Sequence, residues 1–309
     1  MTLRAVFFGS PEFSIPSLRA LHRENEVVAV VTQPDRSSGR GRTLTPPPVK
    51  RVALELGLRV FQPERLRRRS VREELTALGA DVFVVVAYGQ ILSPRLLAVP
   101  QYGCVNVHGS LLPKYRGAAP IQWAVLNGES ETGITIMQMD AGVDTGPMLR
   151  SHRIDLNSDE TAGSLHDRLA PLGAELMVET LASMAAGKSV AEDQNDADAS
   201  MAPMLSKADG RVDFSGTAFS VDHWIRGMDP WPSAFTSLGE ATMRLFGSEA
   251  TRDKGAAGEV LDCDERGLLV ACGEGAVRIR ELQLPGRRRM RARDLTAGKP
   301  IPSGTILGT

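Results

Sequence analysis

The sequence has few cysteines and no apolar run long enough to span a bilayer, and each shortage excludes a class of protein. Its three cysteines, Cys104, Cys263 and Cys272, have neither the paired spacing of a metal site nor the even number of a disulfide framework. We interpret them as structural residues of a protein in a reducing cytosol. The first residues, MTLRAVFFGSPEF, enter an apolar strand without the cationic segment and apolar core of a secretory signal. We expect a cytoplasmic protein with no metal and no membrane partner.

Three sequence motifs that would name a reaction are also missing. The first expected strand, turn and helix pass through GSPEF, which lacks the second and third glycines of G-x-G-x-x-G. Pro11 and Glu12 in this turn oppose the close approach of an anionic phosphate. The sequence contains neither a P-loop nor the G-x-S-x-G turn of a hydrolase. We therefore predict no nicotinamide or flavin cofactor and no serine nucleophile of that kind.

Charge of either sign is nearly balanced, with a formal net charge of -1, so the chain as a whole is not drawn to nucleic acid. A polyanionic partner must therefore meet a local basic segment, and two such segments are present. One spans residues 33–48 (QPDRSSGRGRTLTPPP) and carries Arg36, Arg40 and Arg42 with almost no compensating acid. Its glycines and prolines predict a long, mobile loop without a regular element. Loops of this length are usually either functional or disordered. A solvated insertion is one interpretation, and the arginines favour phosphate contact.

The second basic segment is GRRRMRAR, which begins at Gly286 and contains Arg287, Arg288 and Arg289. From its composition alone it is either a solvated tail region or a surface that follows a phosphate backbone. Both interpretations remain open at this point.

Short apolar runs alternate with segments of helical spacing through the first 190 residues. We predict strands at 4–8, 27–31, near Phe61, and at 81–87, 104–108, 132–139 and 154–156, and helices at 14–22, 49–56, 63–78, 118–126 and 161–186. Near-continuous apolar strands are typical of a parallel sheet covered on both faces. The alternation predicts an α/β, doubly wound domain.

The character of the chain changes after about residue 200. The stretch EDQNDADAS (192–200) is acidic and poor in large apolar residues, which is typical of a linker. One amphipathic helix at 217–227 then precedes short strands at 233–238, 242–246, 258–261, 267–272 and 276–282. This spacing predicts a small β-barrel or sandwich. We predict a domain at 1–190, a linker at 191–207 and a second domain at 208–309.

The strongest chemical signal lies between Gly103 and Asp144. Asn106 and His108 are two residues apart on an apolar strand, so both side chains project from one face. Asp144 follows the strand at 132–139 in a second glycine-rich loop, and it can reach them if the two strands are neighbours. An amide and an imidazole aimed at a carbonyl oxygen would stabilise the oxyanion formed during acyl transfer to an amine. A neighbouring carboxylate would orient the imidazole. Taken alone, N-x-H is more often a turn with a satisfied histidine.

The motifs VNVHGSLLPKYRGAAP and TGITIMQMDAGVDTG resemble the formyltransferase family that uses 10-formyltetrahydrofolate. The resemblance covers most of residues 1–190 and implies a Rossmann-like formyltransferase domain in which Asn106, His108 and Asp144 are catalytic. It also implies that the folate lies against the S-L-L-P loop, with its pterin between the segment 86–92 and the loop 140–144. The residues implied to bind the folate are Val86, Leu92, Ser110, Leu111, Leu112, Pro113 and Asp140.

The full-length pattern, including LSKADGRVDFS and DPWPSAF, resembles those family members whose acceptor is initiator methionyl-tRNA. This implies that the arginine loop enters the acceptor stem and that a small OB-like β-barrel contacts the tRNA body, with Arg36, Arg40, Arg42, Arg287, Arg288 and Arg289 as candidate contacts. Arg40 is the residue expected to matter most in the loop. We expect a monomer. Two alternatives are a formyltransferase acting on a sugar-nucleotide amine, which would leave the cationic loop unexplained, and a protein that only binds RNA.

Overall fold

The structure is a computed structural model that describes residues 2–38, 43–295 and 300–308. The chain divides into two compact units that interleave along the sequence. The first unit comprises Met1–Pro120, Thr132–Ile154 and His166–Ala202, and the second comprises Ile121–Glu131, Asp155–Leu165 and Pro203–Thr309. None of the helices within the described ranges is long and apolar enough to cross a membrane.

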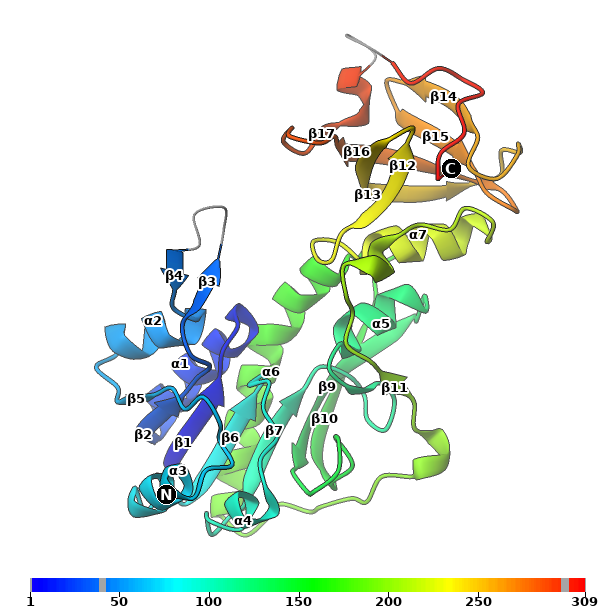
Figure 1. The fold of residues 1–309 in the computed structure, drawn as a ribbon. Helices are drawn as coiled ribbons and strands as arrows, with labels where there is room; N and C mark the ends of the chain where they lie inside the picture. Colours follow the sequence, from blue (N-terminus) through cyan, green and yellow to red (C-terminus); the bar gives the residue numbers. More distant parts are fainter. Residues whose placement is uncertain (1, 39–42, 296–299, 309) are drawn as a thin grey trace. The chain divides into compact units, whose positions relative to one another are not determined.

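The apolar runs of the first half form a seven-stranded sheet in the order β10-β9-β7-β6-β1-β2-β5 (Figure 1). Its strands are β1 (Arg4–Gly9), β2 (Glu26–Val31), β5 (Val60–Phe61), β6 (Val82–Val86), β7 (Cys104–His108), β9 (Glu131–Gln138) and β10 (Met148–Asp155). Strands β5, β2, β1, β6 and β7 pair in parallel, and β9 is antiparallel to β7. The chain winds outward from β1 to β5 and then returns to β6 on the other side of β1. The predicted doubly wound α/β fold is confirmed, and such sheets bind ligands at the carboxyl ends of the strands near this reversal.

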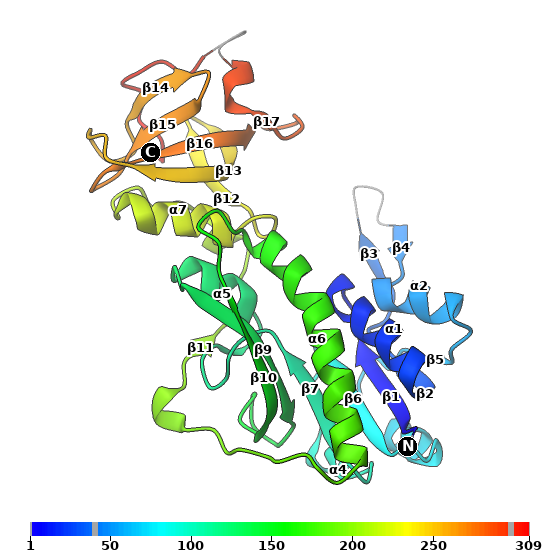
Figure 2. The same ribbon diagram turned by 180° about the vertical axis from the view of Figure 1, so that it is seen from behind.

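Helices cover both faces of this sheet. The helices of the whole chain are α1 (Ile15–Glu24), α2 (Pro48–Glu55), α3 (Arg69–Ala77), α4 (Pro94–Leu97), α5 (Pro120–Leu126), α6 (Ala162–Ala185) and α7 (Ala218–Gly227). On one face, Leu75 of α3 and Leu96 of α4 join a buried cluster with Phe83 of β6. On the opposite face α6 lies along the sheet (Figure 2). A Cβ at Gly173 of this helix would come within 2.8 Å of the Val107 side chain. Helices therefore cover both faces of the sheet, and we expect the functional site at the ends of its strands.

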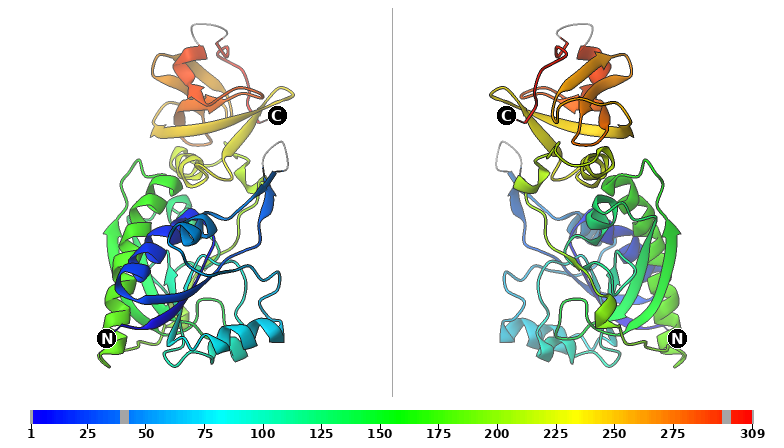
Figure 3. Two further views of the ribbon diagram at one scale, coloured as in Figure 1. Left: turned by 90° about the vertical axis from the view of Figure 1, so that its left-hand side faces the viewer. Right: turned by 90° about the vertical axis from the view of Figure 1, so that its right-hand side faces the viewer.

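The second unit contains a sheet in the order β12-β13-β16-β15-β14, with β17 also paired to β16. Its strands are β12 (Ala234–Leu238), β13 (Ala241–Thr251), β14 (Val260–Asp264), β15 (Gly267–Ala271), β16 (Ala276–Gln283) and β17 (Met290–Arg291). All its pairings are antiparallel, and α7 packs against β13 (Figure 3). The prediction of a β-rich C-terminal part is confirmed. Among the described strands β12 and β14 end the pairing order, so the pairing does not close into a barrel.

The prediction that residues 33–48 contain no regular element was wrong. Arg36–Ser38 (β3) and Thr43–Thr45 (β4) form a two-stranded antiparallel sheet, and residues 39–42 lie outside the described part of the chain. The prolines at 34 and 46–48 flank the paired residues, so they do not interrupt the pairing. At the base of β3, the Asp35 carboxylate accepts hydrogen bonds from Lys50 Nζ and Gln62 Nε2. These contacts attach the start of β3 to the sheet domain.

Two other expected elements differ from the structure, and one helix was missed. The strand expected at 154–156 is the end of β10, which is much longer and has mostly exposed side chains. The helix expected at 63–78 begins only at Arg69, because the Gln90 side chain hydrogen-bonds Leu66 N and Pro63 O and holds this segment in an irregular form. The short helix α4 was not predicted.

Part of the segment expected to be a linker belongs to the first unit. Met201–Ala202 (β11) pairs in parallel with Arg116–Gly117 (β8), next to the catalytic candidates. The domain limits 1–190 and 208–309 remain a prediction. The segment between them includes β11, which pairs with β8.

Candidate active site

Strand β7 places two polar side chains at the carboxyl edge of the sheet. All five of its residues are buried, and Cys104, Asn106 and His108 share one face because side chains alternate along a strand. Asn106 is 8% exposed and His108 is 5% exposed. Burial of two polar groups is costly unless both are hydrogen-bonded, so their partners define what the site can do.

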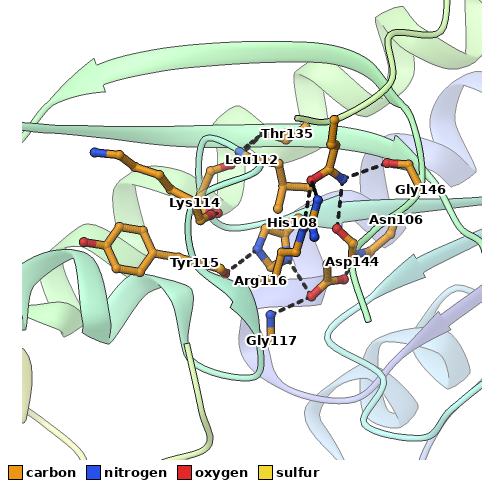
Figure 4. Close-up of polar contacts among 12 residues, drawn as sticks. Asn106, His108, Leu112, Lys114, Tyr115, Arg116, Gly117, Thr135, Asp144 and Gly146 are labelled. Atoms are coloured by element: carbon orange, nitrogen blue, oxygen red, sulfur yellow. Dashed lines mark hydrogen bonds and ion pairs between the residues drawn. The ribbon is translucent and has the colours of Figure 1, made fainter. Parts of the chain in front are cut away.

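Asp144 meets both side chains (Figure 4). Asn106 Nδ2 donates to Asp144 Oδ1 at 3.3 Å, and His108 Nδ1 lies 3.5 Å from Asp144 Oδ2. The main-chain N–H of Gly117 donates to the same Oδ2 at 2.8 Å. The structure therefore brings Asn106, His108 and Asp144 together, as the positions of their strands suggested.

The protonation of His108 is partly fixed by its other neighbour. Its Nε2 lies 2.9 Å from the carbonyl oxygen of Tyr115. A carbonyl only accepts, so Nε2 carries a proton and donates. Nδ1 faces the Asp144 carboxylate, and a second proton there would complete an ion pair. Both ring nitrogens thus face protein oxygens in this state, so neither points freely toward a ligand.

Two residues at the site have the left-handed backbone conformation that non-glycine residues rarely adopt. Tyr115 has φ +63° and Asp144 has φ +53°. Such residues cost on the order of 1–3 kcal/mol and persist only where neighbouring contacts hold them. At Tyr115 the main-chain N–H donates to Ser200 Oγ at 2.9 Å. The carbonyl that accepts from His108 is therefore held in place from the segment around residue 200.

Hydrogen bonds within the S-L-L-P segment and to β9 hold the loop after β7 in place. Ser110 is fully buried, and its hydroxyl donates to Lys114 O at 2.7 Å. Thr135 Oγ1 on β9 donates to Ser110 O at 2.8 Å and accepts from Leu112 N at 3.1 Å. Leu112 is buried, whereas Leu111 and Pro113 are half-buried. The last two therefore have the accessible side chains of this loop.

The two segments expected to enclose a pterin carry apolar side chains that sequence reasoning missed. Val86 and Leu92 are core residues, exposed by 0% and 3%, and Asp140 is exposed with its carboxylate bonded to Gly142 N and Thr145 Oγ1. In contrast, Ile91 is 83% exposed and Val143 is 54% exposed. A large apolar residue inside a polar, glycine-containing loop was the signal that could have identified both.

The candidate basic residues differ in their exposure and in their partners. Arg36 on β3 is exposed and donates to Gln33 Oε1, whereas Arg40 and Arg42 lie outside the described residues. Arg287 and Arg288 are exposed, and no ion pair to them is found within the described part of the chain. The Arg289 guanidinium is engaged by Asp229, Glu281 and the ring of Phe246.

The Cys104 thiol is the nearest cysteine to consider as a nucleophile, because it lies on the same strand as Asn106 and His108. Burial raises the pKa of Cys104 to about 12, so this thiol, on the same face as Asn106, stays protonated at neutral pH and is a poor nucleophile. The described residues contain no group of three or more His, Cys, Asp or Glu side chains placed to hold a metal ion. The arrangement of amide, imidazole and carboxylate is suited to stabilising an oxyanion and moving a proton.

Comparison with known proteins agrees with this chemistry. The family model described as "Formyl transferase" matches residues 3–181, which include β7 and the Asp144 loop, and "Formyl transferase, C-terminal domain" matches residues 204–300. The chain belongs to the formyl transferase family. Among curated members of that family, the methionyl-tRNA formyltransferase of Citrifermentans bemidjiense is 49% identical over 99% of this chain and 96% of its own. That of Geobacter sulfurreducens is 50% identical over 99% of this chain and 97% of its own.

Solved structures also include formyl transferases with this fold. An N-formyltransferase from Helicobacter canadensis, in complex with folinic acid and dTDP-3-aminofucose, aligns over 94% of this chain and all of its own. The TM-score is 0.66 and the identity is 17%, so this likeness supports the fold alone.

Proposed function

We propose that this protein transfers the formyl group of 10-formyltetrahydrofolate to the α-amine of initiator methionyl-tRNA, producing formylmethionyl-tRNA for translation initiation. The main structural support for this reaction is the convergence of Asn106, His108 and Asp144 at the carboxyl end of β7. The acceptor is inferred from the near-50% identity to methionyl-tRNA formyltransferases over almost the whole chain.

Direct attack by the amine accounts for all the bonds. The amine nitrogen bonds to the formyl carbon, the bond between that carbon and N10 of the folate breaks, and the proton lost by the amine ends on N10. Negative charge develops on the formyl oxygen. The Asn106 amide has two N–H groups, of which one donates to Asp144, so the second is available to that oxygen. Loss of one such donor typically costs about 3 kcal/mol of barrier.

His108 and Asp144 act as a pair in this proposal. The carboxylate holds the imidazole from the Nδ1 side, beside the developing oxyanion. Donation from His108 to the oxyanion requires its Nε2–H to leave the Tyr115 carbonyl when substrate binds. Catalytic hydrogen bonds often tighten or exchange in this way between the free and the substrate-bound enzyme. Asp144 can then accept the amine proton directly or through water.

We place the folate against the S-L-L-P loop, with the pterin between the segment 86–92 and the loop 140–144. The exposed side chains of Ile91 and Val143 support this placement, because flat heterocycles bind between apolar groups with a few convergent polar ones. Val86 and Leu92 would contribute through their main chain, since their side chains are buried in the core. Ser110 would shape the loop from beneath, while Leu111, Leu112, Pro113 and Asp140 remain candidate contacts.

We assign tRNA contact to the β3–β4 arm with Arg36, Arg40 and Arg42, and to Arg287 and Arg288 in the second unit. These residues would neutralise phosphates by charge and would carry little base-specific information. An OB-like arrangement of the second sheet would suit this role, because such folds commonly bind nucleic acids. A monomeric state and a cytoplasmic location are parts of the same proposal.

Two other functions are distinguishable from this one. A sugar-nucleotide amine as acceptor predicts transfer to a small amine without any tRNA and leaves the cationic arm without a role. An RNA-binding protein without activity predicts tight tRNA binding and no formyl transfer. The intact catalytic trio speaks against the second alternative.

A single-turnover assay with 10-formyltetrahydrofolate and charged initiator tRNA tests the proposal. We expect formylmethionyl-tRNA from the unsubstituted protein, and a loss of turnover with retained tRNA binding in His108→Ala. His152→Ala is the matched control, because His152 is exposed on β10 and lies outside the catalytic trio. A near-normal rate in His108→Ala would remove the proposed role of this histidine, and activity on a small amine alone would replace the acceptor.

A further inference from the structure

The side chain of Gln194 reaches the loop that carries Asp144. Its Nε2 donates to Asp144 O at 2.8 Å and to Gly146 O at 2.7 Å, so one amide group holds both sides of residue 145. Gln194 follows the catalytic aspartate by 50 residues and belongs to the acidic stretch that composition assigned to a linker. Neither resemblance nor pattern gave it a role.

A buried arginine fixes the orientation of this amide. Arg116 is only 6% exposed, and its Nε and Nη2 donate to Gln194 Oε1 at 3.0 and 2.9 Å. The oxygen of the amide is therefore committed to Arg116, which directs both N–H groups of Nε2 toward the two loop carbonyls. Asp196 Oδ1 accepts from Arg116 Nη2 at 2.8 Å and offsets the buried charge.

The loop needs such support because Asp144 is in the left-handed region, at φ +53°. Its carboxylate must also point at two groups on β7 and at Gly117 N. Without the two hydrogen bonds from Gln194, the loop loses the main-chain contacts that oppose relaxation of this strained residue. A displacement of about 1 Å in a catalytic group can lower a rate by roughly 100-fold.

We propose that Gln194 is a positioning residue, which acts on the reaction by holding the main chain of Asp144 and Gly146. The inference rests on the proposed function, because it assigns Asp144 a catalytic role. Gln194 would contact neither the folate nor the tRNA. Its removal therefore lowers kcat and leaves the KM for methionyl-tRNA nearly unchanged.

The test uses two variants of the full-length enzyme. Gln194→Met keeps the length of the side chain and removes all its hydrogen bonds, and Gln194→Glu keeps the contact with Arg116 but cannot donate when ionised. Both should lower kcat, by up to about 100-fold, with the KM for methionyl-tRNA changed less than about twofold. Asn195→Ala is the matched control, because the side chain of the adjacent Asn195 bonds, among the described residues, only within its own turn, to Asp198 and Ala197 N. Its kcat should not change.

A double-mutant comparison shows whether the effect passes through Asp144. In an Asp144→Asn background, Gln194→Met should cause a much smaller loss of kcat than in the unsubstituted enzyme. The same fold loss in both backgrounds, or a normal kcat in Gln194→Glu, would overturn the inference.

A second measurement is independent of activity. Amide hydrogen exchange at Gly117, whose N–H donates to Asp144 Oδ2, should accelerate in Gln194→Met and not in Asn195→Ala. Unchanged exchange would overturn the positioning role even in an active enzyme. Faster exchange in a protein that transfers no formyl group would instead refute only the proposed function.

Discussion

Replacing Arg289 with methionine tests whether this arginine stabilises the fold or contacts the tRNA. Its guanidinium donates to Asp229 Oδ1 and Oδ2 at 3.1 and 3.2 Å, pairs with Glu281, and lies 4.1 Å from the centre of the Phe246 ring. The Asp229 side chain is 9% exposed, whereas that of Arg289 is 41% exposed. Removing one partner of a fully buried pair costs about 3–5 kcal/mol, and an exposed pair contributes about 0–1 kcal/mol. Between these limits we expect Arg289→Met to lower the free energy of unfolding by about 2 kcal/mol.

Arg288→Met is the matched control, since Arg288 is adjacent, exposed and without an ion pair among the described residues. It should change the free energy of unfolding by less than about 0.5 kcal/mol. It should instead reduce the salt dependence of tRNA affinity, lowering the slope of log K against log salt by roughly 0.7 to 0.9 if one phosphate contact is lost. Urea unfolding followed by circular dichroism and filter binding at several salt concentrations measure the two quantities. An Arg289→Met protein with unchanged stability and a reduced salt slope would refute this reasoning.

Two further predictions concern the first unit. Gly117→Ala should lower both kcat and stability, by about 1–3 kcal/mol in unfolding free energy, because φ is +120° and the new Cβ would lie 2.8 Å from Ala202 O. Gly187→Ala has a positive φ of +67° with no atom near its Cβ, so only the backbone strain should appear in its denaturation curve. Tyr88→Phe should stabilise the protein by about 1 kcal/mol, because the buried hydroxyl has no hydrogen-bond partner among the described residues. Burial also raises the pKa of Tyr88, so above pH 10 only the unfolded chain loses this proton, and the stability of the unsubstituted protein falls with rising pH more steeply than that of Tyr88→Phe. Destabilisation by Tyr88→Phe at pH 7 would show that the hydroxyl is satisfied.

The core of the fold could be predicted from the sequence because buried parallel strands appear as near-continuous apolar runs. Strands β6 and β7 are entirely buried and were predicted within one or two residues of their ends. The period of two along β7 also sufficed to put Asn106 and His108 on one face. In contrast, β10 was largely missed because most of its side chains are exposed, so its place in the sheet depends on main-chain pairing that hydropathy does not report.

The support of the site was not predictable for a similar reason. Gln194 and Ser200 reach the loops of Asp144 and Tyr115 from a polar stretch without periodicity, and their contacts depend on which carbonyl or N–H they meet in three dimensions. The same holds for Arg289, whose basic neighbours in sequence resemble a phosphate-binding run while its own guanidinium binds two carboxylates. Composition identifies the kind of side chain in a segment, and only the fold decides its partner.

The pairing of β11 with β8 has a consequence for exchanging parts between relatives. Ser200 O accepts from Arg116 N, and Ala202 O accepts from Ala118 N, so the chain up to residue 202 is attached to the catalytic half by its main chain. A chimera joined near residue 190 would take Gln194, Ser200 and this pairing from the donor of the C-terminal half. A junction after Ala202 would keep Gln194, Ser200 and the β11–β8 pairing together with the N-terminal half of the same protein. Only the residues after Ala202 would then come from the relative. The residues beyond this short strand can therefore be exchanged without replacing Gln194, Ser200 or the main-chain pairing.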